Sequence, residues 1–245
     1  MSVPETQVCA LDDADAVARN AAERFVELAR ESIGARERFC VALAGGSTPK
    51  RTYELLATGA YNEQIEWSKV HIFFGDERCV PPDSAESNYR MANEALLSRV
   101  PIPPQSVHRI NGQGDPVASA GFYEDDLRTF FDDASWPRFD LVLLGMGDDG
   151  HTASLFPRST ALEERDRWVV ANWVEKLGVS RITLTVPAIN HAANIIFLVS
   201  GTAKSERLAE VLRGIHDPQK LPSQLITAEN GSLVWLLDRA AAARL

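Results

Sequence analysis

One histidine, His151, lies in the glycine- and acid-rich segment Gly145-Met-Gly-Asp-Asp-Gly-His-Thr152, which directly follows the apolar run 141–144. Histidine is the side chain that exchanges a proton near neutral pH, so it can serve as a general base. A carboxylate two residues away, Asp149, can fix the tautomer of the ring and stabilise the imidazolium as it forms. This setting favours a catalytic base over a histidine that only satisfies backbone groups in a turn.

The same segment also matches the pattern G-x-G-x-x-G and nearly matches a P-loop, with His151 where the lysine would stand. Asp148 and Asp149 would then place negative charge against a pyrophosphate, and Pro157 shortens the helix that such a motif needs. We therefore expect no nucleotide or other cofactor here. No two of the five histidines have the spacing of metal ligands, so no metal site is expected either.

A second loop, Ala44-Gly-Gly-Ser-Thr-Pro49, also follows an apolar run. Gly45 and Gly46 allow a close approach of backbone amides to a ligand, and Ser47 and Thr48 add hydroxyl donors at the start of a helix. The loop fits a phosphate cradle and a capped strand-to-helix turn equally well. It is not a nucleophile elbow, because a proline stands where that motif has its last glycine.

Charged residues follow a further apolar run at Asp76-Glu-Arg78, where they could form a ligand site or a solvated ion-pair cluster. Arg181 opens a later strand. Lys204 lies near the start of an expected helix, where a cation opposes the helix dipole. That mismatch indicates a bound anion.

The composition limits the partners that the chain can have. Among 245 residues, 34 are acidic and 25 basic, for a net charge of −9, which argues against nucleic acid or an anionic membrane surface as a partner. No run approaches 18 apolar residues, and the first eleven residues lack the features of a secretory signal. The three cysteines fit neither a disulfide framework nor a metal site. A cytoplasmic location is therefore expected, with no obligate protein partner.

Apolar runs of strand length alternate with segments of helical period, which is typical of α/β proteins. The expected strands are 39–44, 70–74, 107–110, 140–144, 168–171, 181–186, 194–199 and 233–237, and the expected helices are about 12–32, 49–56, 88–97, 117–131 and 203–212. We predict a single Rossmann-like domain, residues 1–245, with a mostly parallel sheet and helices on both faces. Ligands bind beyond the carboxyl ends of such strands, where the three polar loops lie.

The three loops resemble those of the 6-phosphogluconolactonase family, which is related to the glucosamine-6-phosphate isomerase/deaminase group. The resemblance is carried by Leu43–Pro49, by Phe74–Arg78 with Ser87-Asn-Tyr89, and by Gly145–Pro157, and more weakly by Arg181–Thr185 and by Ser200-Gly201 with Lys204. The longest of these, Gly145–Pro157, is the most specific.

The resemblance implies hydrolysis of 6-phospho-D-glucono-1,5-lactone to 6-phosphogluconate in the oxidative pentose phosphate pathway, without a cofactor. It makes His151 the base that activates water and places Asp149 beside it. Arg78 would meet either the phosphate or the oxyanion. The remaining implied contacts are to the sugar and its phosphate, from Gly45, Gly46, Ser47, Thr48, Asp76, Asn88, Gly150, Arg181 and Lys204.

Two alternatives remain open at this point. The isomerase/deaminase group has a glutamate five residues after the histidine, where this chain has Phe156, and a tyrosine where this chain has Arg78. Both departures favour the lactonase. A non-catalytic sugar-phosphate sensor could use the same residues, although the pairing of His151 with Asp149 speaks against it.

Overall fold

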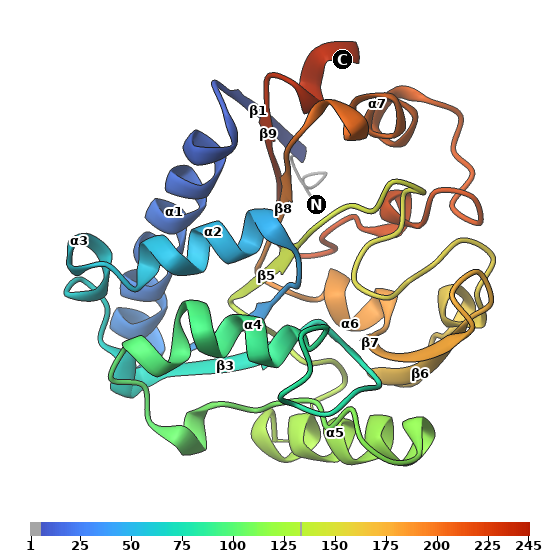
Figure 1. Cartoon of the computed structure of the whole chain (residues 1–245). Coiled ribbons are helices and arrows are strands. Elements are labelled where there is room, and N and C mark those ends of the chain that lie inside the picture. Colours follow the sequence, from blue (N-terminus) through green and yellow to red (C-terminus); the bar gives the residue numbers. More distant parts are fainter. Residues whose placement is uncertain (1–5, 133) are drawn as a thin grey trace.

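A computed structural model describes residues 6–132 and 134–245, and its central element is a six-stranded, entirely parallel sheet (Figure 1). The strand order is β1 (Thr6–Leu11), β9 (Ser232–Asp238), β8 (Asn194–Val199), β5 (Leu141–Leu144), β2 (Phe39–Leu43) and β3 (Val70–Phe74). The expected α/β fold with a mostly parallel sheet is confirmed. After β2 the chain forms β3 on one side of β2, and it then forms β5 on the other side of β2. The direction in which strands are added therefore reverses between β2 and β5. The crevice for a ligand is therefore expected beyond the ends of β2 and β5.

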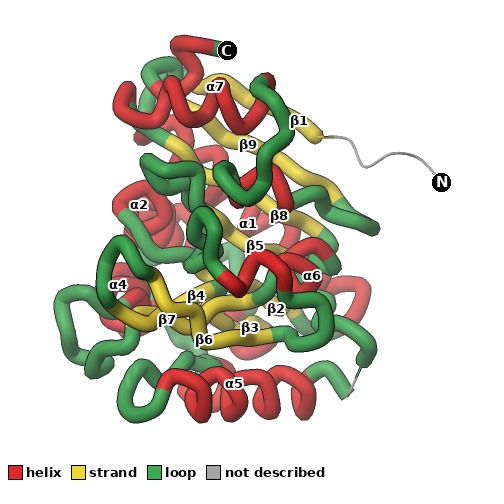
Figure 2. Tube along the Cα trace, turned by 90° about the vertical axis from the view of Figure 1, so that its right-hand side faces the viewer, coloured by secondary structure: helices red, strands yellow, loops and turns green. Residues whose placement is uncertain are grey.

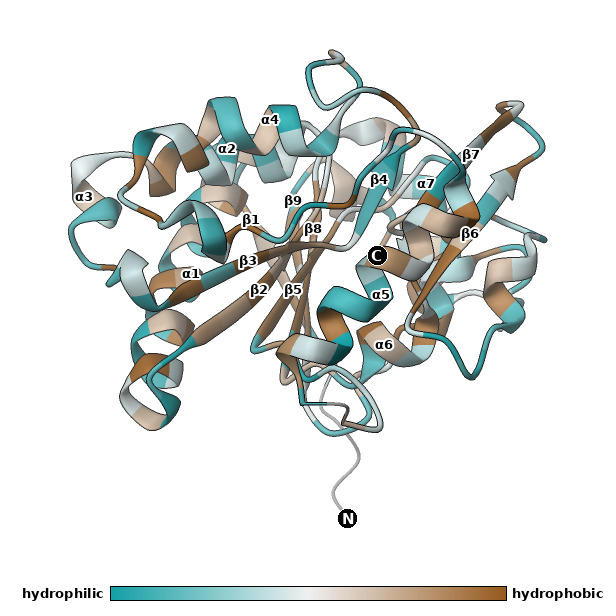
Figure 3. Ribbon diagram, turned by 90° about the horizontal axis from the view of Figure 1, so that it is seen from below, coloured by the Kyte–Doolittle hydropathy of each residue, from teal (hydrophilic) through white to brown (hydrophobic). Residues whose placement is uncertain are grey.

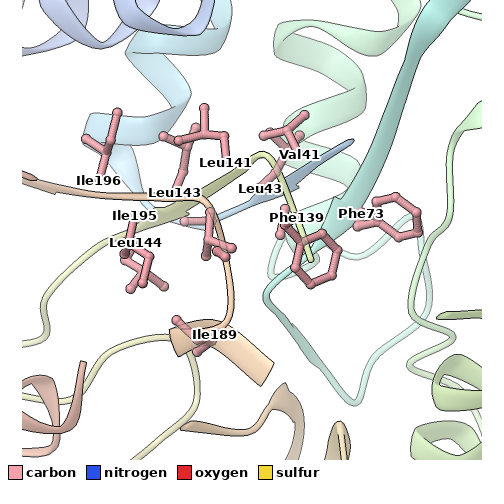
Figure 4. Packing of buried hydrophobic residues seen from close by; sticks show 14 of the residues in the cluster. Val41, Leu43, Phe73, Phe139, Leu141, Leu143, Leu144, Ile189, Ile195 and Ile196 are labelled. Carbon is pink, nitrogen blue, oxygen red and sulfur yellow. The ribbon is translucent and has the colours of Figure 1, made fainter. Parts of the chain in front are cut away.

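The inner strands are short and apolar because both faces of the sheet are covered (Figures 3 and 4). Figure 4 shows Leu141, Leu143 and Ile196 on the side of α2 (Ser47–Leu56), while Leu144 and Ile195 point toward Ile189 of α6 (Val186–Asn190). One continuous cluster of buried apolar side chains includes residues of the sheet and of the helices on both sides.

Helices cover the sheet as the helical periods predict, and side-chain caps define several of their starts. Asp13, Ser87 and Asp115 accept hydrogen bonds from backbone amides in the first turns of α1, α4 and α5. The first helix, expected to end near residue 32, continues through Gly34 to Arg36, and Glu37 at its C-cap has φ 58°. The helices are α1 (Ala14–Arg36), α2 (Ser47–Leu56), α3 (Gly59–Asn62), α4 (Asn88–Ala95), α5 (Pro116–Phe130), α6 (Val186–Asn190) and α7 (Ser205–Arg213).

A second, antiparallel sheet adds three strands in the order β4 (Asp76–Arg78), β7 (Val179–Leu184) and β6 (Val169–Val174). Figure 2 shows these strands grouped next to α5. Two of the expected strands belong to this sheet. The residues of β4 were expected in a loop, because three charged side chains carry no strand signal.

Other differences from the expected elements concern short segments. The expected strand at 107–110 is wrong: only Val107 forms an isolated bridge, to Ile72. The edge strand β1 was not expected, since its side chains are mostly exposed and do not form an apolar run. Single turns of 3-10 helix occur at Trp67–Lys69, Leu97–Arg99, Pro104–Ser106, Thr160–Glu163, Thr202–Lys204, Pro222–Leu225 and Ala241–Arg244.

Two buried tyrosines fix the ends of β2 and β3. The hydroxyl of Tyr53, in α2, donates to the carbonyl of Ala44 at 2.9 Å and accepts from its amide at 3.0 Å. Tyr123, in α5, makes the same pair of bonds with Phe74, at 3.1 and 2.9 Å. Burial raises the pKa of both hydroxyls, so they stay protonated and able to donate. The loops that follow these two strands therefore start from fixed points.

Candidate active site

A cleft of about 300 Å³ lies beyond the carboxyl ends of β2, β5 and β8, and we call it the main cleft. Each of these strands ends at a loop that the sequence singled out, so sheet topology brings the loops together. The lining residues are Ala44–Pro49, Asp76, Arg78, Asn88, Gly145–Gly147, His151, Ala153, Leu198–Ser200 and Lys204.

A smaller cavity of about 220 Å³, the side pocket, adjoins the main cleft. Asp76, Arg78, His151 and Ala153 line both cavities and so form their common wall. The side pocket is otherwise lined by Ser154, Phe156, Lys176, Leu177 and Arg181. The imidazole thus lies where the two cavities meet.

His151 and Asp149 form a tight pair. Nδ1 of the ring lies 2.5 Å from Oδ1 of Asp149, and the same carboxylate oxygen accepts a bond of 3.2 Å from the His151 amide. Although partial burial opposes its ionisation, hydrogen bonds from His151 and Lys176 hold the pKa of Asp149 well below its ordinary value. An ionised carboxylate can only accept, so Nδ1 must carry the proton. Nε2 of the neutral ring is then the atom with a free lone pair, as a general base requires.

Two neighbours fix the plane of this ring. Phe156 stacks on it with ring centroids 4.1 Å apart and an interplanar angle of 23°. On Gly147, a Cβ atom would lie only 2.1 Å from Nδ1 and Cε1 of the ring. Residue 147 must therefore be glycine because a side chain would collide with the imidazole, and not because its backbone has a positive φ.

Asp76 lies at the common wall, and its carboxylate is held at both oxygens. Asn88 Nδ2 donates to Oδ1 at 3.1 Å, and Ser154 Oγ donates to Oδ2 at 2.7 Å. Gly45 packs against the amide of Asn88, since a Cβ there would lie 2.0 Å from Oδ1. The structure thus links the glycine loop, β4 and α4 in one network.

Glu77 belongs to the scaffold of the site and is 3% exposed. Burial raises the pKa of its carboxyl group, whereas the hydrogen bonds that it accepts favour the charged form. Oε1 accepts from the amides of Arg78 and Asn88 at 2.7 and 2.8 Å, and Oε2 accepts from Ser87 Oγ and the Tyr89 amide at 3.0 and 2.9 Å. The carboxylate therefore binds β4 to the start of α4.

We expect Glu77→Gln to destabilise the protein, because one amide group would face two buried donors. Each unsatisfied buried donor costs about 1–3 kcal/mol, so the free energy of unfolding should fall by about 2–4 kcal/mol. Denaturant unfolding measures this change. Glu94→Gln, which alters an exposed ion pair on α4, is the matched control and should change the free energy by less than about 0.5 kcal/mol. Equal stability of the two variants would contradict the scaffold role.

Arg78 and Arg181 face each other across β4 and β7 as directly opposed residues. Like charges in such a pair repel. Burial and the neighbouring Arg78 lower the pKa of the Arg181 guanidinium. Arg78 donates to the carbonyl of Glu86, and within residues 6–132 and 134–245 neither arginine forms an ion pair. An anion between the two side chains would relieve their repulsion.

Lys204 lines the main cleft directly before α7, and its ammonium lies 2.5 Å from Oδ1 of Asp148. The N-terminus of α2, which has Gly46 at the cap position and no side-chain cap, lines the same cleft. The main cleft therefore has two features that attract an anion.

The structure does not bring all expected site residues to one surface. Gly150 lines neither cavity; it has φ 82° and packs against Leu221. Arg181 lines the side pocket but not the main cleft with Lys204. Asp149 lines neither cavity and contacts the base at Nδ1 of its ring.

Several residues at the site had not been assigned a role from the sequence: Ser154, Phe156 as a stacking partner, Lys176 and Ser200. Ser154 and Phe156 lie in the segment after His151, and Ser200 belongs to the weaker match Ser200-Gly201, so these segments held a signal. Lys176 carries no local signal.

The described residues contain no cluster of three His, Cys, Asp or Glu side chains suited to a metal ion. Among the helices of the described residues, none has the length and apolar character that crossing a membrane requires.

Comparison with known proteins identifies the family of the chain. Residues 12–235 match the family model of glucosamine-6-phosphate isomerases/6-phosphogluconolactonase. The chain is 46% identical to the 6-phosphogluconolactonase of Nostoc sp. over 217 residues, which cover 87% of this chain and 88% of that protein. It is 38% identical to the Haemophilus influenzae 6-phosphogluconolactonase over 201 residues, 82% of this chain and 85% of that one.

Solved structures give the same result. The 6-phosphogluconolactonase of Trypanosoma cruzi superposes with a TM-score of 0.88 at 31% identity, over 100% of this chain and 98% of that one. A monomeric glucosamine-6-phosphate deaminase has a TM-score of 0.82 at 21% identity, over 98% of this chain and 100% of that one, which is a likeness of fold alone. The chain belongs to the glucosamine-6-phosphate isomerase/6-phosphogluconolactonase family.

Proposed function

We propose that this protein is a 6-phosphogluconolactonase, which hydrolyses 6-phospho-D-glucono-1,5-lactone to 6-phosphogluconate in the pentose phosphate pathway. The observation that carries the proposal is the His151–Asp149 pair at the junction of two cavities, in a chain closely similar to 6-phosphogluconolactonases. A δ-lactone is an activated ester, so water and a general base suffice and no covalent nucleophile is required.

In this mechanism, Nε2 of His151 takes a proton from water as the water oxygen attacks the lactone carbonyl. Asp149 keeps the proton on Nδ1 and stabilises the imidazolium that forms. The imidazolium then returns its proton to the ring oxygen as the acyl–oxygen bond breaks, which opens the lactone. Proton and leaving group thus balance with a single side chain acting first as base and then as acid.

The charged groups divide the remaining work. Arg78 lies with His151 on the common wall, and we assign it to the oxyanion that develops on the carbonyl oxygen. The N-terminus of α2, with residues 45–48, and Lys204 bind the 6-phosphate in the main cleft. Arg181, which lines the side pocket, attracts the negatively charged substrate. Asp76 and Asn88 accept hydrogen bonds from the sugar hydroxyls and so orient the sugar.

We expect Lys204→Met to raise KM for the lactone by about 10- to 100-fold, since a charge-assisted bond to the phosphate is worth about 1.5–3 kcal/mol. The loss also leaves Asp148 beside the phosphate without its partner. Steady-state kinetics measure this change, and Lys220→Met, at an exposed lysine outside both cavities, is the control. The slower hydrolysis of unphosphorylated glucono-1,5-lactone should be unaffected. An equal loss with both lactones would contradict phosphate binding by Lys204.

The proposed activity is tested with lactone generated in place by glucose-6-phosphate dehydrogenase. Purified protein should speed the decay of the lactone above its spontaneous rate. Release of ammonia from glucosamine 6-phosphate would instead support the isomerase/deaminase reaction. That outcome is not expected, because Phe156 stacks on the histidine where that group has its glutamate. Binding of sugar phosphates without turnover would support a sensor.

We also propose that residues 1–245 act as one domain in the cytoplasm. The continuous hydrophobic cluster supports the first statement. The acidic composition and the sugar-phosphate substrate support the second.

A further inference from the structure

Lys176 lies at the tip of the hairpin that joins β6 to β7, far along the chain from the catalytic loop. The turn is fixed by bonds from the amides of Leu177 and Gly178 to the carbonyl of Val174, at 3.0 and 2.9 Å. Gly178 has φ 62°, a conformation that favours glycine. Arg181 follows on the same hairpin and lines the side pocket together with Lys176.

The ammonium of Lys176 reaches the catalytic pair from this tip. Nζ lies 2.6 Å from Oδ2 of Asp149, whose other oxygen lies 2.5 Å from Nδ1 of His151. The carboxylate therefore bridges a permanent cation and the proposed base. Lys176 itself is exposed, with 63% of its side chain accessible, whereas Asp149 is 23% accessible. A long exposed side chain gains little stability from a surface ion pair, so the contact calls for another explanation.

We propose that Lys176 is a positioning residue for the hydrolytic reaction. Its ammonium holds the second oxygen of Asp149 and partly neutralises the negative charge of that carboxylate beside His151. This inference rests on the proposed function. With its second oxygen bound, the carboxylate keeps one orientation, and the ring keeps Nε2 toward the cleft.

Other charges near the ring come from several elements. Asp76 and Arg78 of β4 line both cavities with His151, Arg181 of β7 lines the side pocket, and Lys204, paired with Asp148, lines the main cleft. Of these groups and Lys176, only Lys176 makes a direct bond to the Asp149 carboxylate. Its removal should therefore change the titration of the ring through Asp149, while the other charges stay in place.

The decisive measurement compares Lys176→Met with Lys176→Arg. Without the cation, Asp149 stabilises the imidazolium more strongly, and the repulsion between the two positive charges is lost. Both effects raise the pH at which the ring loses its proton. We expect the acid limb of the kcat/KM profile, and the NMR titration of the His151 ring in the free protein, to move up by about half a pH unit. Lys176→Arg should retain the native midpoint because it retains the charge.

The matched control is Lys69→Met. Lys69 also makes a 2.6 Å ion pair, with Glu37, but at the start of β3, away from both cavities. It should leave the midpoint unchanged. A uniform loss of rate in Lys176→Met with an unmoved midpoint would overturn the inference. So would a rise in KM alone, which would make Lys176 a phosphate ligand. If the unaltered protein has no lactonase activity, the proposed function fails, and the NMR titration still decides whether Lys176 controls the ring.

Discussion

His151→Ala should reduce kcat/KM for the phosphorylated lactone by about 10²–10⁴-fold, the usual contribution of general acid–base catalysis. The residual rate should reflect positioning of the lactone and stabilisation of the oxyanion by the remaining cleft. Stopped-assay or coupled measurements must subtract the spontaneous hydrolysis of the lactone, which sets the lower limit of detection.

His216→Ala is the matched control, because His216 is an exposed histidine outside both cavities. It should retain the activity of the unaltered protein. His151→Gln tests the base more narrowly, since glutamine keeps a polar group of similar size but cannot take up a proton. A fully active His151→Gln variant, folded by circular dichroism, would show that another group activates the water.

Gly147→Ala should lower kcat/KM by about 100-fold although the substituted residue has no functional group. The new methyl group would lie 2.1 Å from the imidazole, so either the ring or the loop must move. A displacement of about 1 Å at a catalytic group can cost this much rate. The loss should fall mainly on kcat, because the proposed phosphate-binding residues lie on other loops.

For the glycine variant, Gly34→Ala provides the comparison. Apart from the chain neighbours and the backbone of the helix itself, no heavy atom lies within 4 Å of a Cβ at Gly34, and α1 gains a residue of higher helix propensity there. That variant should be fully active and slightly more stable. If Gly147→Ala retains full activity with a native NMR titration of His151, the proposed packing of the ring against residue 147 is wrong.

The sequence predicts the parallel sheet and the catalytic loop for the same physical reason. Buried parallel strands are nearly all apolar, so the runs that became β2, β3, β5 and β8 stand out, and the polar segments between them mark the strand ends. His151 could be identified because Asp149 lies only two residues away. The cap of α4 by Ser87 is local in the same way, because the hydroxyl accepts from the amide of Arg90, three residues on.

Features that depend on long-range contacts could not be predicted. β4 consists of charged residues and is a strand only because it pairs with β7. Lys176 contacts Asp149 across 27 residues of sequence, and Ser154 reaches Asp76 across 78. The sequence also could not show that Lys204 lines the main cleft and Arg181 the side pocket, because it indicates where the strands end but not how the cavities are divided.

The tyrosine hydroxyls of Tyr53 and Tyr123 suggest how this enzyme could diversify. Because each hydroxyl holds a strand end from within the core, the loops that begin there start from a fixed position, although Gly45 must stay glycine because of its contact with Asn88. Exchanges at Ser47 or Thr48, in the proposed phosphate-binding loop, could then alter how the phosphate is bound without moving the histidine on the neighbouring loop. Natural or laboratory selection can therefore vary Ser47 and Thr48 on a loop whose starting point is fixed. Libraries confined to these positions should yield many folded members.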